Sequence, residues 1–598
     1  MQQPPIKDYA LIADGQSAAL VSKEGSIDWC CLARIDAESC FSRLLDWEGG
    51  GACIIQPVAD HEVARCYLDR TMVLETRFHT PDGEVCLRDF LGVHGPDNPA
   101  DQLIRIVEGI SGEVALNVEI SPRFCYGQVA PWIRCHGDRL FTALGGDRGL
   151  VIYGDVDLER CDGHDLRAQV MVRQGERLCL GIHPQPAYTL YPAQPEAPGT
   201  DFEARLEEAI AYWRDWASQC AEDFAGIDQA LRSALIIKSL IYHPSGAIAA
   251  AATSSLPEQA GGRKNWDYRF SWIRDSAFAI KVMSDLGFEE VARGFRYFIE
   301  RTTAGSAEDL QPIYGLDGGH ILTERKLQGL AGYRGADPVR IGNAAESQKQ
   351  LDIYGELLEV AFEGAQRGPE PDREYWHLLR STVELVETLW QQPDEGIWES
   401  RGESQHYTHS KVMCWVAVER MLKLAAQFDL DVPVQRWRSL ANNIRQAVEN
   451  RGYDHERGVF VRAFGSTKMD CALLLLPRVG FIDFRDERMM RTVDEIRRKL
   501  EAAPGLFYRH EDAIGEEGAF IACSFWLVEC LVEQGRDEEA RKIYQRVSAV
   551  AGDLGLFSEM ADPDTGELLG NLPQGLSHYS HISATMALGR GRGAGQGD

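Results

Sequence analysis

A change of hydrophobic period near Pro198 constrains the fold of this chain more than any other feature. From about Tyr9 to about Glu196, short runs of alternating apolar and polar residues are separated by Gly-rich turns, a pattern typical of β-strands. After Pro198 the apolar residues recur about every 3.6 positions, as they do in amphipathic helices. The chain is therefore expected to contain an N-terminal antiparallel β-sandwich followed by a helical domain.

Turn residues place some of the expected strands. Residues 71–80 and 84–93 flank a Pro-Asp-Gly sequence, and residues 103–110 and 113–120 flank a Ser-Gly sequence. Both patterns predict a strand, a turn and a second strand. Residues 168–182 are expected to form one further strand.

The spacing of apolar residues also sets the expected domains. They are a β-sandwich over residues 1–200, a connecting helix within 201–226, a helical domain over 227–590 and a disordered Gly-rich tail over 591–598. Twelve helices are expected in the helical domain, near residues 227–243, 272–286, 289–302, 343–364, 372–391, 407–428, 434–449, 468–479, 486–501, 518–534, 537–550 and 577–588.

The lengths of the connections favour a particular helical architecture. Connections into the third, fifth and later odd-numbered helices are short, whereas those into the even-numbered helices are mostly long. Short connections join antiparallel helical hairpins, so all the long loops emerge on one face. Twelve alternating helices predict an (α/α)6 barrel, and the functional site is expected on its long-loop face.

Residues 265–275, Asn-Trp-Asp-Tyr-Arg-Phe-Ser-Trp-Ile-Arg-Asp, have the composition of a sugar site. Aromatic rings offer apolar faces to the C–H surface of a sugar, while Arg and Asp bind its hydroxyls. A buried Arg–Asp pair beneath an aromatic lid explains the same composition equally well. Similar aromatic, Arg and acidic residues recur in the other long loops.

Glycoside hydrolysis commonly needs two carboxyl groups in different environments. Trp398 would shield Glu399 from water and so favour its protonated form, whereas Glu559 lies in a loop that would leave it ionised. In a chain this acidic, each of these residues could equally be a solvated surface charge. Residue chemistry alone does not select the pair.

Charge and cysteine content exclude other classes of function. The formal net charge of −29 disfavours nucleic acids, anionic membranes and polyanionic substrates, and is compatible with a neutral ligand. The fifteen cysteines lack zinc-ligand spacing, and no secretory signal or bilayer-length apolar run is present. The expectation is a cytoplasmic protein with reduced thiols. The proposed chemistry requires no cofactor, although acidic loops leave a structural calcium or magnesium ion open.

Several ordered motifs resemble glycoside hydrolase family 15, the glucoamylase family, and in particular its bacterial trehalase-like and glucoamylase-like branch. The N-terminal stretches 12–21 and 25–30 resemble the sandwich domain of that branch. The helical domain matches at residues 265–275, 338–343, 396–402, 408–413, 518–526 and 570–574. The resemblance covers nearly the whole chain, and it implies an (α/α)6 barrel.

The resemblance also implies roles for individual residues. Glu399, in a Trp-Glu motif with Trp398, matches the general acid, and Glu559, in a looser Ser-Glu match, matches the general base; Glu567 is a nearby competitor. The Trp-x-Arg-Asp match implies that Trp272, Arg274 and Asp275 hold a terminal glucose, with Trp398 shaping the pocket.

Further pocket residues rest on weaker matches, and each could instead brace a loop; they are Tyr314, Asp317, Arg340, Arg509 and Glu517. His409 and His578 are expected to serve as hydrogen-bonding residues at helix starts.

The implied activity is inverting, exo-acting hydrolysis of a terminal α-glucosidic bond with release of β-glucose, and α,α-trehalose is the first candidate substrate. Malto- and isomalto-oligosaccharides are alternatives within the family. The other classes considered are an α-glucoside phosphorylase and a non-catalytic glucan-binding protein. An inverting enzyme is expected to hold its two carboxyl groups roughly 6.5–9.5 Å apart. Sandwich loops near the site could restrict the length of the substrate.

Overall fold

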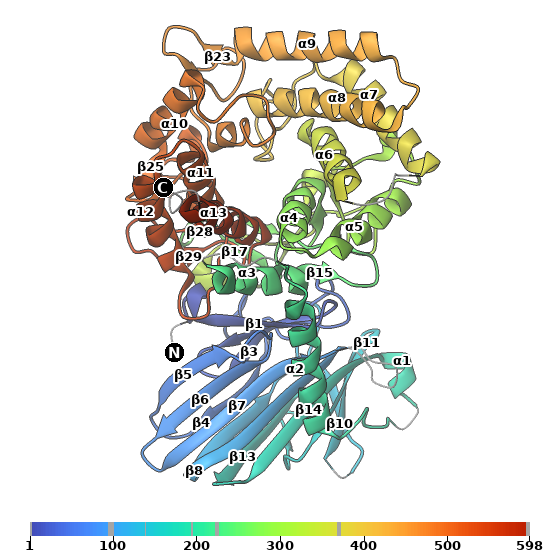
Figure 1. Cartoon of the computed structure of the whole chain (residues 1–598). Coiled ribbons are helices and arrows are strands. Elements are labelled where there is room, and N and C mark those ends of the chain that lie inside the picture. Colours follow the sequence, from blue (N-terminus) through green and yellow to red (C-terminus); the bar gives the residue numbers. More distant parts are fainter. Residues whose placement is uncertain are drawn as a thin grey trace.

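The computed structural model describes residues 3–93, 101–137, 139–192, 195–221, 226–367 and 372–593. In Figure 1 the β-rich N-terminal part, blue to teal, lies below a ring of helices formed by the rest of the chain, green to red. The predicted order of a β-sandwich followed by a helical domain is confirmed.

The sandwich consists of antiparallel strands in two layers that share strand β8. One layer has the order β1-β2-β3-β4-β8-β13-β12, and the other has the order β5-β6-β7-β8-β14-β11-β10-β9. The bounds are β1 Tyr9–Ala13, β2 Ala18–Ser22, β3 Ser26–Cys31, β4 Cys53–Pro57, β5 Glu62–Tyr67, β6 Leu74–Thr80, β7 Gly83–Gly92, β8 Gln102–Ile120, β9 Trp132–Cys135, β10 Leu140–Gly145, β11 Arg148–Gly154, β12 Glu159–Cys161, β13 Asp165–Arg173 and β14 Arg177–Pro186.

The turn predicted at the Ser-Gly sequence is wrong, because strand β8 runs continuously through it. The chain stays paired with β7 through this point, where Gly112 lies opposite Gly83, and β8 then continues from one layer into the other. Gly112 has a φ of +64°, and a Cβ on it would lie 2.0 Å from the Asp82 carbonyl oxygen. The glycine therefore permits a bend and a close strand contact rather than a chain reversal.

The single strand predicted over residues 168–182 is also wrong, because β13 and β14 form a hairpin there. The chain reverses at Gln174 and Gly175, with Gly175 at a φ of +79°. Reciprocal backbone hydrogen bonds join this reversal to Gly109 of β8. Gln-Gly is a weak turn signal by itself, and this partner lies far away in the sequence.

Helix α2, Phe202–Ser218, links the two domains. Its N-terminal half buries Phe202, Leu206 and Ala209 against sandwich residues, whereas Trp216 near its C-terminus stacks on Phe288 of the helical domain with ring centroids 4.1 Å apart. The connecting helix is thus packed along its length against both domains.

The helical domain forms the predicted (α/α)6 arrangement. The inner elements α4, α6, α8, η5, α11 and α13 contact one another in a closed ring, and α3, α5, α7, α9, α10 and α12 pack outside it (Figure 1). The bounds are α3 Ile227–Leu240, α4 Ile273–Asp285, α5 Glu289–Thr302, α6 Asp352–Arg367, α7 Arg373–Leu389, α8 Thr408–Phe428, α9 Val434–Arg451, η5 Cys471–Leu475, α10 Glu487–Leu500, α11 Ile521–Glu533, α12 Asp537–Ser548 and α13 Gly575–Gly593.

Short elements complete the described fold. The strands are β15 Ile241–Tyr242, β16 Ala247–Ile248, β17 Ser254–Pro257, β18 Asn265–Asp267, β19 Ser271–Trp272, β20 Ile313–Tyr314, β21 Arg325–Leu327, β22 Val339–Ile341, β23 Tyr453–Asp454, β24 Val459–Phe460, β25 Glu501–Ala503, β26 Leu506–Phe507, β27 Ala519–Phe520, β28 Met560–Ala561 and β29 Leu568–Leu569. The helical turns are α1 Ala187–Leu190, η1 Ile6–Asp8, η2 Ala307–Asp309, η3 Tyr333–Gly335, η4 Ala344–Ser347, η6 Glu511–Ala513 and η7 Ala549–Ala551.

Two predicted inner helices are shorter than expected, for local reasons. The Asn343 side chain caps the short turn η4, and the α-helix proper begins only at Asp352. In the eighth helix, the Asp470 side chain caps a single 3₁₀ segment, and Pro477 prevents its extension. Both segments still occupy the inner positions that the alternation predicts.

Arg269 joins the two domains at the segment 265–275. Its guanidinium donates to Asp267 at 2.7 and 2.9 Å, to the Ala37 carbonyl oxygen at 2.6 Å and to the Tyr126 hydroxyl at 2.8 Å. Ala37 and Tyr126 belong to the sandwich. Both charged side chains are essentially inaccessible, at 1% and 0% exposure, so the pair is shielded from water where the two domains meet.

Apolar packing across the same junction makes one continuous core. The buried Trp29 of β3 donates its indole N–H to the Ala252 carbonyl oxygen at 2.8 Å. One cluster of buried apolar residues runs from Ile6 in the first domain to Leu588 in the second. We propose the domain division at residues 1–200, 201–226 and 227–590. Helix α13 extends to Gly593, three residues into the tail predicted to be disordered, and the final five residues lie outside the described part of the chain.

None of the helices within the described residues combines the length and apolarity needed to cross a lipid bilayer.

Replacing Arg269 by Ala is expected to destabilise the protein by about 3–5 kcal/mol, because Asp267 would then be a buried carboxylate without a counter-charge. The measurement is the denaturation midpoint in urea, followed by tryptophan fluorescence. Asp317→Asn is the matched control, since it breaks the ion pair between Arg34 and the half-exposed Asp317 across the same junction, while Arg34 keeps its other partner, Asp36. That control is expected to cost at most about 1 kcal/mol. Equal midpoints for the two variants would contradict the role assigned to Arg269.

Candidate active site

The candidate site lies where the loops before the six inner elements converge. Residues from each of these loops line two connected cavities, which we call the inner pocket and the outer chamber. Four residues line both cavities: Tyr268, Trp398, Glu399 and Arg509. The cavity volume is about 60 Å³ for the inner pocket and about 410 Å³ for the outer chamber. A narrow polar pocket therefore adjoins a much larger space.

The segment 265–275 supplies much of one wall of the inner pocket. Strands β18 and β19 hold it extended, and helix α4 begins immediately afterwards. Tyr268, Trp272, Arg274 and Asp275 all line the pocket, whereas Arg269 lies at the domain junction. The aromatic, Arg and Asp residues of this segment thus divide between the inner pocket and the domain interface.

Glu399 sits in a strained turn at the boundary between the two cavities. Its φ is +55°, in the left-handed region that β-carbon-bearing residues seldom adopt, and its N–H donates to the Gly396 carbonyl oxygen. The buried Asp394 fixes this turn by accepting from the N–H groups of Gly396 and Leu351, each at 3.2 Å. The side chain of Glu399 keeps 20% of its surface exposed toward the cavities.

Three donors converge on one oxygen of Glu399. The Trp272 indole N–H lies 2.5 Å, an Arg274 N–H 3.1 Å and the Gln350 amide 3.3 Å from Oε1. Arg274 is itself bound by Asp352 at 2.9 Å and by the Gln350 side-chain oxygen at 3.0 Å.

Gln350 and Asp352 were missed by the sequence analysis, which placed them inside a continuous helix. The alternation Gln-x-Gln-x-Asp before an apolar helical run was the only available signal.

Glu559 lines the inner pocket at the entry to strand β28. The Tyr268 hydroxyl donates to its Oε1 at 2.9 Å, while Oε2 is buried and accepts no hydrogen bond from the described residues. Burial, followed by the nearby Glu258, raises the pKa of Glu559 well above its ordinary value, against the lowering effects of Arg509 and the Tyr268 hydroxyl. The sequence analysis expected Glu559 to be ionised because of its polar loop, and it did not anticipate this burial.

Arg509 is a cation that lines both cavities. It forms a two-pronged ion pair with Glu517, at 2.5 and 2.6 Å, and also contacts Glu258 at 3.1 Å. Lys264 donates to Glu517 at 2.7 Å. Burial raises the pKa of Glu258 to about 7, whereas the two cations hold the pKa of Glu517 below its ordinary value despite its burial.

Trp398 forms an aromatic wall shared by the two cavities. Its indole N–H donates to Asp470 at 2.8 Å, and its ring contacts Phe520 and Trp526 with centroids 5.2 and 5.9 Å away. These contacts fix the orientation of the ring. Asp275 also lines the inner pocket, and burial raises its pKa to about 6, with Arg274 opposing that effect.

The remaining sequence-predicted residues divide by location. Arg509 and Glu517 line the outer chamber, whereas Tyr314 and Arg340 line neither cavity. The Tyr314 hydroxyl bonds backbone groups of its own loop, and Arg340 lies over the Trp266 ring with 4.4 Å between the guanidinium carbon and the ring centroid. Both residues brace loops around the site.

Four further candidates from the sequence also lie elsewhere. Asp317 pairs with Arg34 of the sandwich, and Glu567 pairs with Arg334 at 3.0 Å outside both cavities. His578 bonds Ser233 and the Phe557 N–H, as a structural residue would. His409 lines a separate cavity deeper in the barrel, and burial lowers its pKa to about 4.

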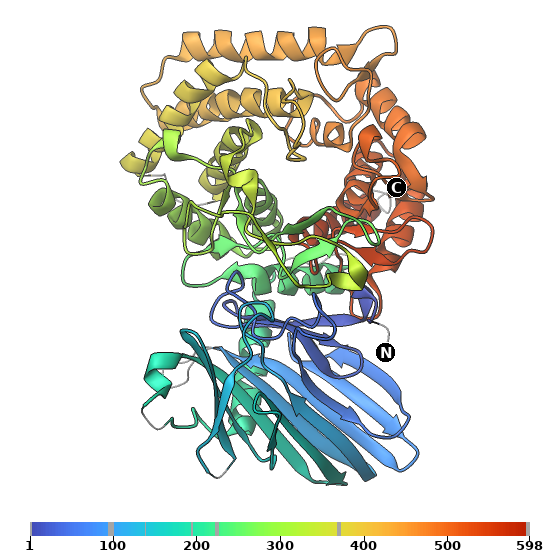
Figure 2. The same cartoon turned by 180° about the vertical axis from the view of Figure 1, so that it is seen from behind.

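The sandwich supports the site from outside. Every residue that lines the two cavities comes from the helical domain. Asp36 of the sandwich accepts from the Leu316 N–H, and Leu45 accepts from the Gly332 N–H, so both hold the long loop between α5 and α6. Figure 2 shows this loop, green to yellow, running beside the blue N-terminal segment. The described residues contain no cluster of three or more His, Cys, Asp or Glu side chains suited to a metal ion.

Known proteins resemble both domains of this chain. The model of glycosyl hydrolases family 15 matches residues 226–586, and a trehalase-like N-terminal model matches residues 1–175. The chain is 34% identical over 607 residues to a protein named trehalase from Thermoplasma volcanium, covering 98% of this chain and 94% of that one. It is 35% identical over 620 residues to a trehalase from Mycolicibacterium smegmatis, covering 98% and 91%.

Among solved structures, a bacterial glucoamylase complexed with acarbose superposes with a TM-score of 0.72 at 12% identity, covering 98% of this chain and 96% of that one. At this level of identity the likeness concerns the fold alone.

Proposed function

Because the chain belongs to glycosyl hydrolases family 15, we propose that it cleaves the bond of a terminal α-glucosyl unit held in the inner pocket, with inversion, and that its substrate is α,α-trehalose. That it is a glycoside hydrolase follows from its family and its full-length relatives. In this proposal the inner pocket holds the glucosyl ring that is attacked, and the outer chamber holds the second ring of the substrate.

One observation carries the proposal: two carboxyl groups, Glu399 and Glu559, line the same inner pocket in different surroundings. Glu399 lies at the boundary with the outer chamber, where a departing group would sit. Glu559 is buried within the pocket, and its Oε2 accepts no hydrogen bond from the described side chains or backbone. A water molecule between that oxygen and a bound sugar would complete its hydrogen bonding.

The proposed reaction is a single displacement. Glu399 gives its proton to the glycosidic oxygen as the bond from that oxygen to the anomeric carbon breaks. A water molecule attacks the same carbon from the opposite side while Glu559 accepts one of its protons. The products are β-glucose and the departing sugar. Exchange with solvent then returns a proton to Glu399 and removes one from Glu559.

The surrounding groups suit a bound glucosyl ring. Arg274 and Asp275 offer charged partners for hydroxyls, and Trp272 and Trp398 offer aromatic surface, all on the wall of the inner pocket. Arg509 adds a donor at the boundary between the cavities. No substrate contact is proposed for Tyr314 or Arg340.

The size of the outer chamber and the names of the relatives support trehalose. The chamber lies beyond Glu399 and is lined by Trp266, Lys264 and Glu517 among other polar residues, which suits a second sugar ring. The long relatives from Thermoplasma volcanium and Mycolicibacterium smegmatis are both named trehalase.

The substrate is tested by glucose release from trehalose, maltose, isomaltose and soluble starch at equal glucosyl concentration. The highest kcat/KM is expected for trehalose. Proton NMR at early times should show one β-glucose and one α-glucose per trehalose, because only the ring whose anomeric carbon is attacked inverts. A preference for maltose or starch would replace trehalose by a glucan, and glucose 1-phosphate formed only with phosphate would replace hydrolysis by phosphorolysis.

Glu399→Gln and Glu559→Gln are each expected to lower kcat on trehalose by about 10²-fold or more, since each removes a proton-transfer group. Both changes preserve side-chain volume, so circular dichroism and thermal midpoints should confirm folding. Glu567→Gln, in the same region of sequence but outside both cavities, is the matched control and should retain turnover. Near-wild-type turnover by a folded Glu399→Gln protein would reject the proposed acid.

Tyr268→Phe is expected to move the pH optimum of kcat/KM to higher pH and to lower kcat about tenfold. The hydroxyl stabilises ionised Glu559, so its loss raises the pKa of Glu559 further, and the base then reaches its active, ionised form only at higher pH. The measurement is a pH–rate profile on trehalose. Tyr314→Phe removes a hydroxyl that bonds only its own loop, and its optimum should match the wild type. An unchanged optimum in Tyr268→Phe would separate the tyrosine from the base.

A further inference from the structure

The hydrogen bonds of Glu399 are concentrated on one of its two oxygens. Among the described residues, every hydrogen bond donated to this carboxyl ends on Oε1, from Trp272, Arg274 and Gln350. An oxygen that accepts three donors has no room for a proton of its own. The proton required of a general acid must therefore reside on Oε2, the oxygen without such a donor.

Arg274 creates an electrostatic difficulty for that arrangement. A guanidinium 3.1 Å from a carboxyl oxygen favours the ionised carboxylate, whereas a general acid must hold its proton until the bond breaks. The arginine is 6% exposed, so water screens its charge very little. Something must offset the charge of Arg274 for Glu399 to act as an acid.

Asp352 provides the offsetting charge. Its Oδ2 lies 2.9 Å from Arg274 Nη1, its side chain is fully inaccessible, and its Oδ1 accepts no hydrogen bond from the described residues. The positive charge of Arg274 thus balances the negative charge of Asp352. Its position as the first residue of α6, where the helix N-terminus favours an anion, further stabilises the carboxylate.

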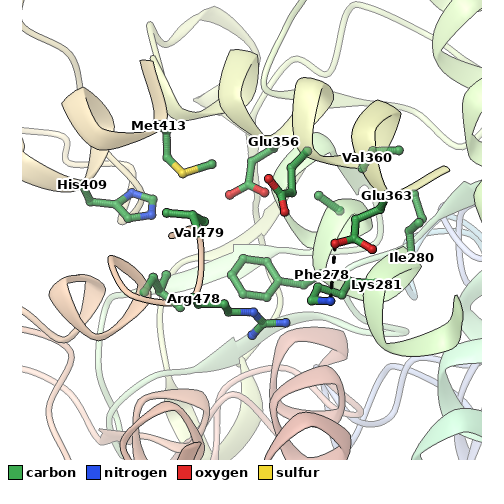
Figure 3. Close-up of a pocket in the computed structure, with 13 residues that line it drawn as sticks. Phe278, Ile280, Lys281, Glu356, Val360, Glu363, His409, Met413, Arg478 and Val479 are labelled. Atoms are coloured by element: carbon green, nitrogen blue, oxygen red, sulfur yellow. Dashed lines mark ion pairs between the residues drawn. The ribbon is translucent and has the colours of Figure 1, made fainter. Parts of the chain in front are cut away.

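Two ionisable groups close to Asp352 favour their neutral forms. One turn along α6, Glu356 lines the deeper cavity of Figure 3, and burial followed by Asp352 raises its pKa well above the ordinary value, which favours its neutral form. His409 from α8 lines the same cavity and is neutral because burial lowers its pKa to about 4.

On the remaining sides stand Asp275 of α4, beside Arg274, and Arg478, which follows η5 and lies across the cavity from Glu356 (Figure 3). The Lys281–Glu363 pair at the far end of that cavity is self-compensated.

Gln350 fixes the geometry of the same cluster without adding charge. Its side-chain oxygen accepts from Arg274 Nη1 at 3.0 Å, and its amide donates to Glu399 Oε1 at 3.3 Å and to the Gln348 side-chain oxygen at 2.9 Å. At 2% exposure it has few alternative orientations. It therefore ties the arginine and the carboxyl into one rigid unit.

We propose that Asp352 and Gln350 are positioning residues that keep Glu399 protonated on Oε2, Asp352 by neutralising Arg274 and Gln350 by holding the arginine and Oε1 together. The inference rests on the proposed role of Glu399 as the acid. Arg274 then has two effects on Glu399. Its Nη2 holds the carboxyl in place, while Asp352, bound to Nη1, offsets the positive charge that would otherwise favour loss of the Glu399 proton.

Asp352→Asn is the direct test, because it removes the charge and keeps the shape. The uncompensated guanidinium should favour ionised Glu399, so the pH optimum of kcat/KM on trehalose should move to lower pH by about half a unit. At the optimum the loss should be about tenfold on trehalose. It should be smaller, about threefold or less, on α-glucosyl fluoride, because fluoride departs with little help from an acid.

Gln350→Glu tests the opposite sign and covers the case in which Asp352→Asn does not fold. A carboxylate added beside Arg274 and Glu399 favours the protonated acid, so the optimum should move to higher pH. Glu356→Gln is the matched control: it changes another buried carboxyl one turn along α6, whose raised pKa favours the neutral form and which has no hydrogen bond to Arg274, and its profile should overlay the wild type. Asp352→Glu, which restores the charge, should recover the wild-type optimum.

Three outcomes would overturn the inference. They are an unchanged optimum in a folded Asp352→Asn protein, equal losses on trehalose and α-glucosyl fluoride, or a shift of the same size in Glu356→Gln. Failure of the proposed function is distinguishable, because it would appear as turnover by Glu399→Gln. An inactive Glu399→Gln together with an unmoved Asp352→Asn would leave the acid in place and reject only its control by Asp352.

Discussion

A guanidinium buried away from water needs a partner of opposite charge, and this requirement fixes the structure around residues 265–275. The segment carries two buried arginines five positions apart. Arg269 finds its partners in Asp267 and in the sandwich, and Arg274 finds them in Asp352 and Glu399. Satisfying both groups at once fixes the segment between the domain interface on one side and the inner pocket on the other. The positions of the pocket residues in this segment therefore depend on the contact between the two domains.

The architecture could be predicted from the sequence because its signals are local and repeated. Alternation of short and long connections identified the inner helices even where η5 replaced an α-helix, since the inner position depends on chain direction rather than on helix length. The strand errors arose where distant residues decide the outcome: Gly112 permits a bend only because Gly83 lies opposite, and Gly175 reverses the chain against Gly109. A glycine by itself does not distinguish a bend from a turn.

The sequence predicted which polar residues line the candidate site. It did not predict their burial, their hydrogen bonds or the shifts of their pKa values. The motifs located Glu399, Glu559, Arg274 and Asp275, which all line the inner pocket. The sequence could not indicate that Glu559 is buried beside Glu258, or that Glu399 receives three donors on one oxygen. Those properties come from residues far apart in the sequence: Tyr268 lies 291 positions from Glu559, and Gln350 lies 49 positions from Glu399. The pKa values follow distances in space that no motif encodes.

The interface at Arg269 also bears on how the protein is made. A chain grows from its N-terminus, and domains generally fold in that order as they emerge. We therefore expect the sandwich, which supplies the Ala37 carbonyl and the Tyr126 hydroxyl, to fold before residues 265–275 leave the ribosome. An early part of the barrel then meets a finished surface that receives one of its arginines. The N-terminal domain then acts as a built-in template for the nascent barrel, and a barrel expressed alone would start its assembly without that guide.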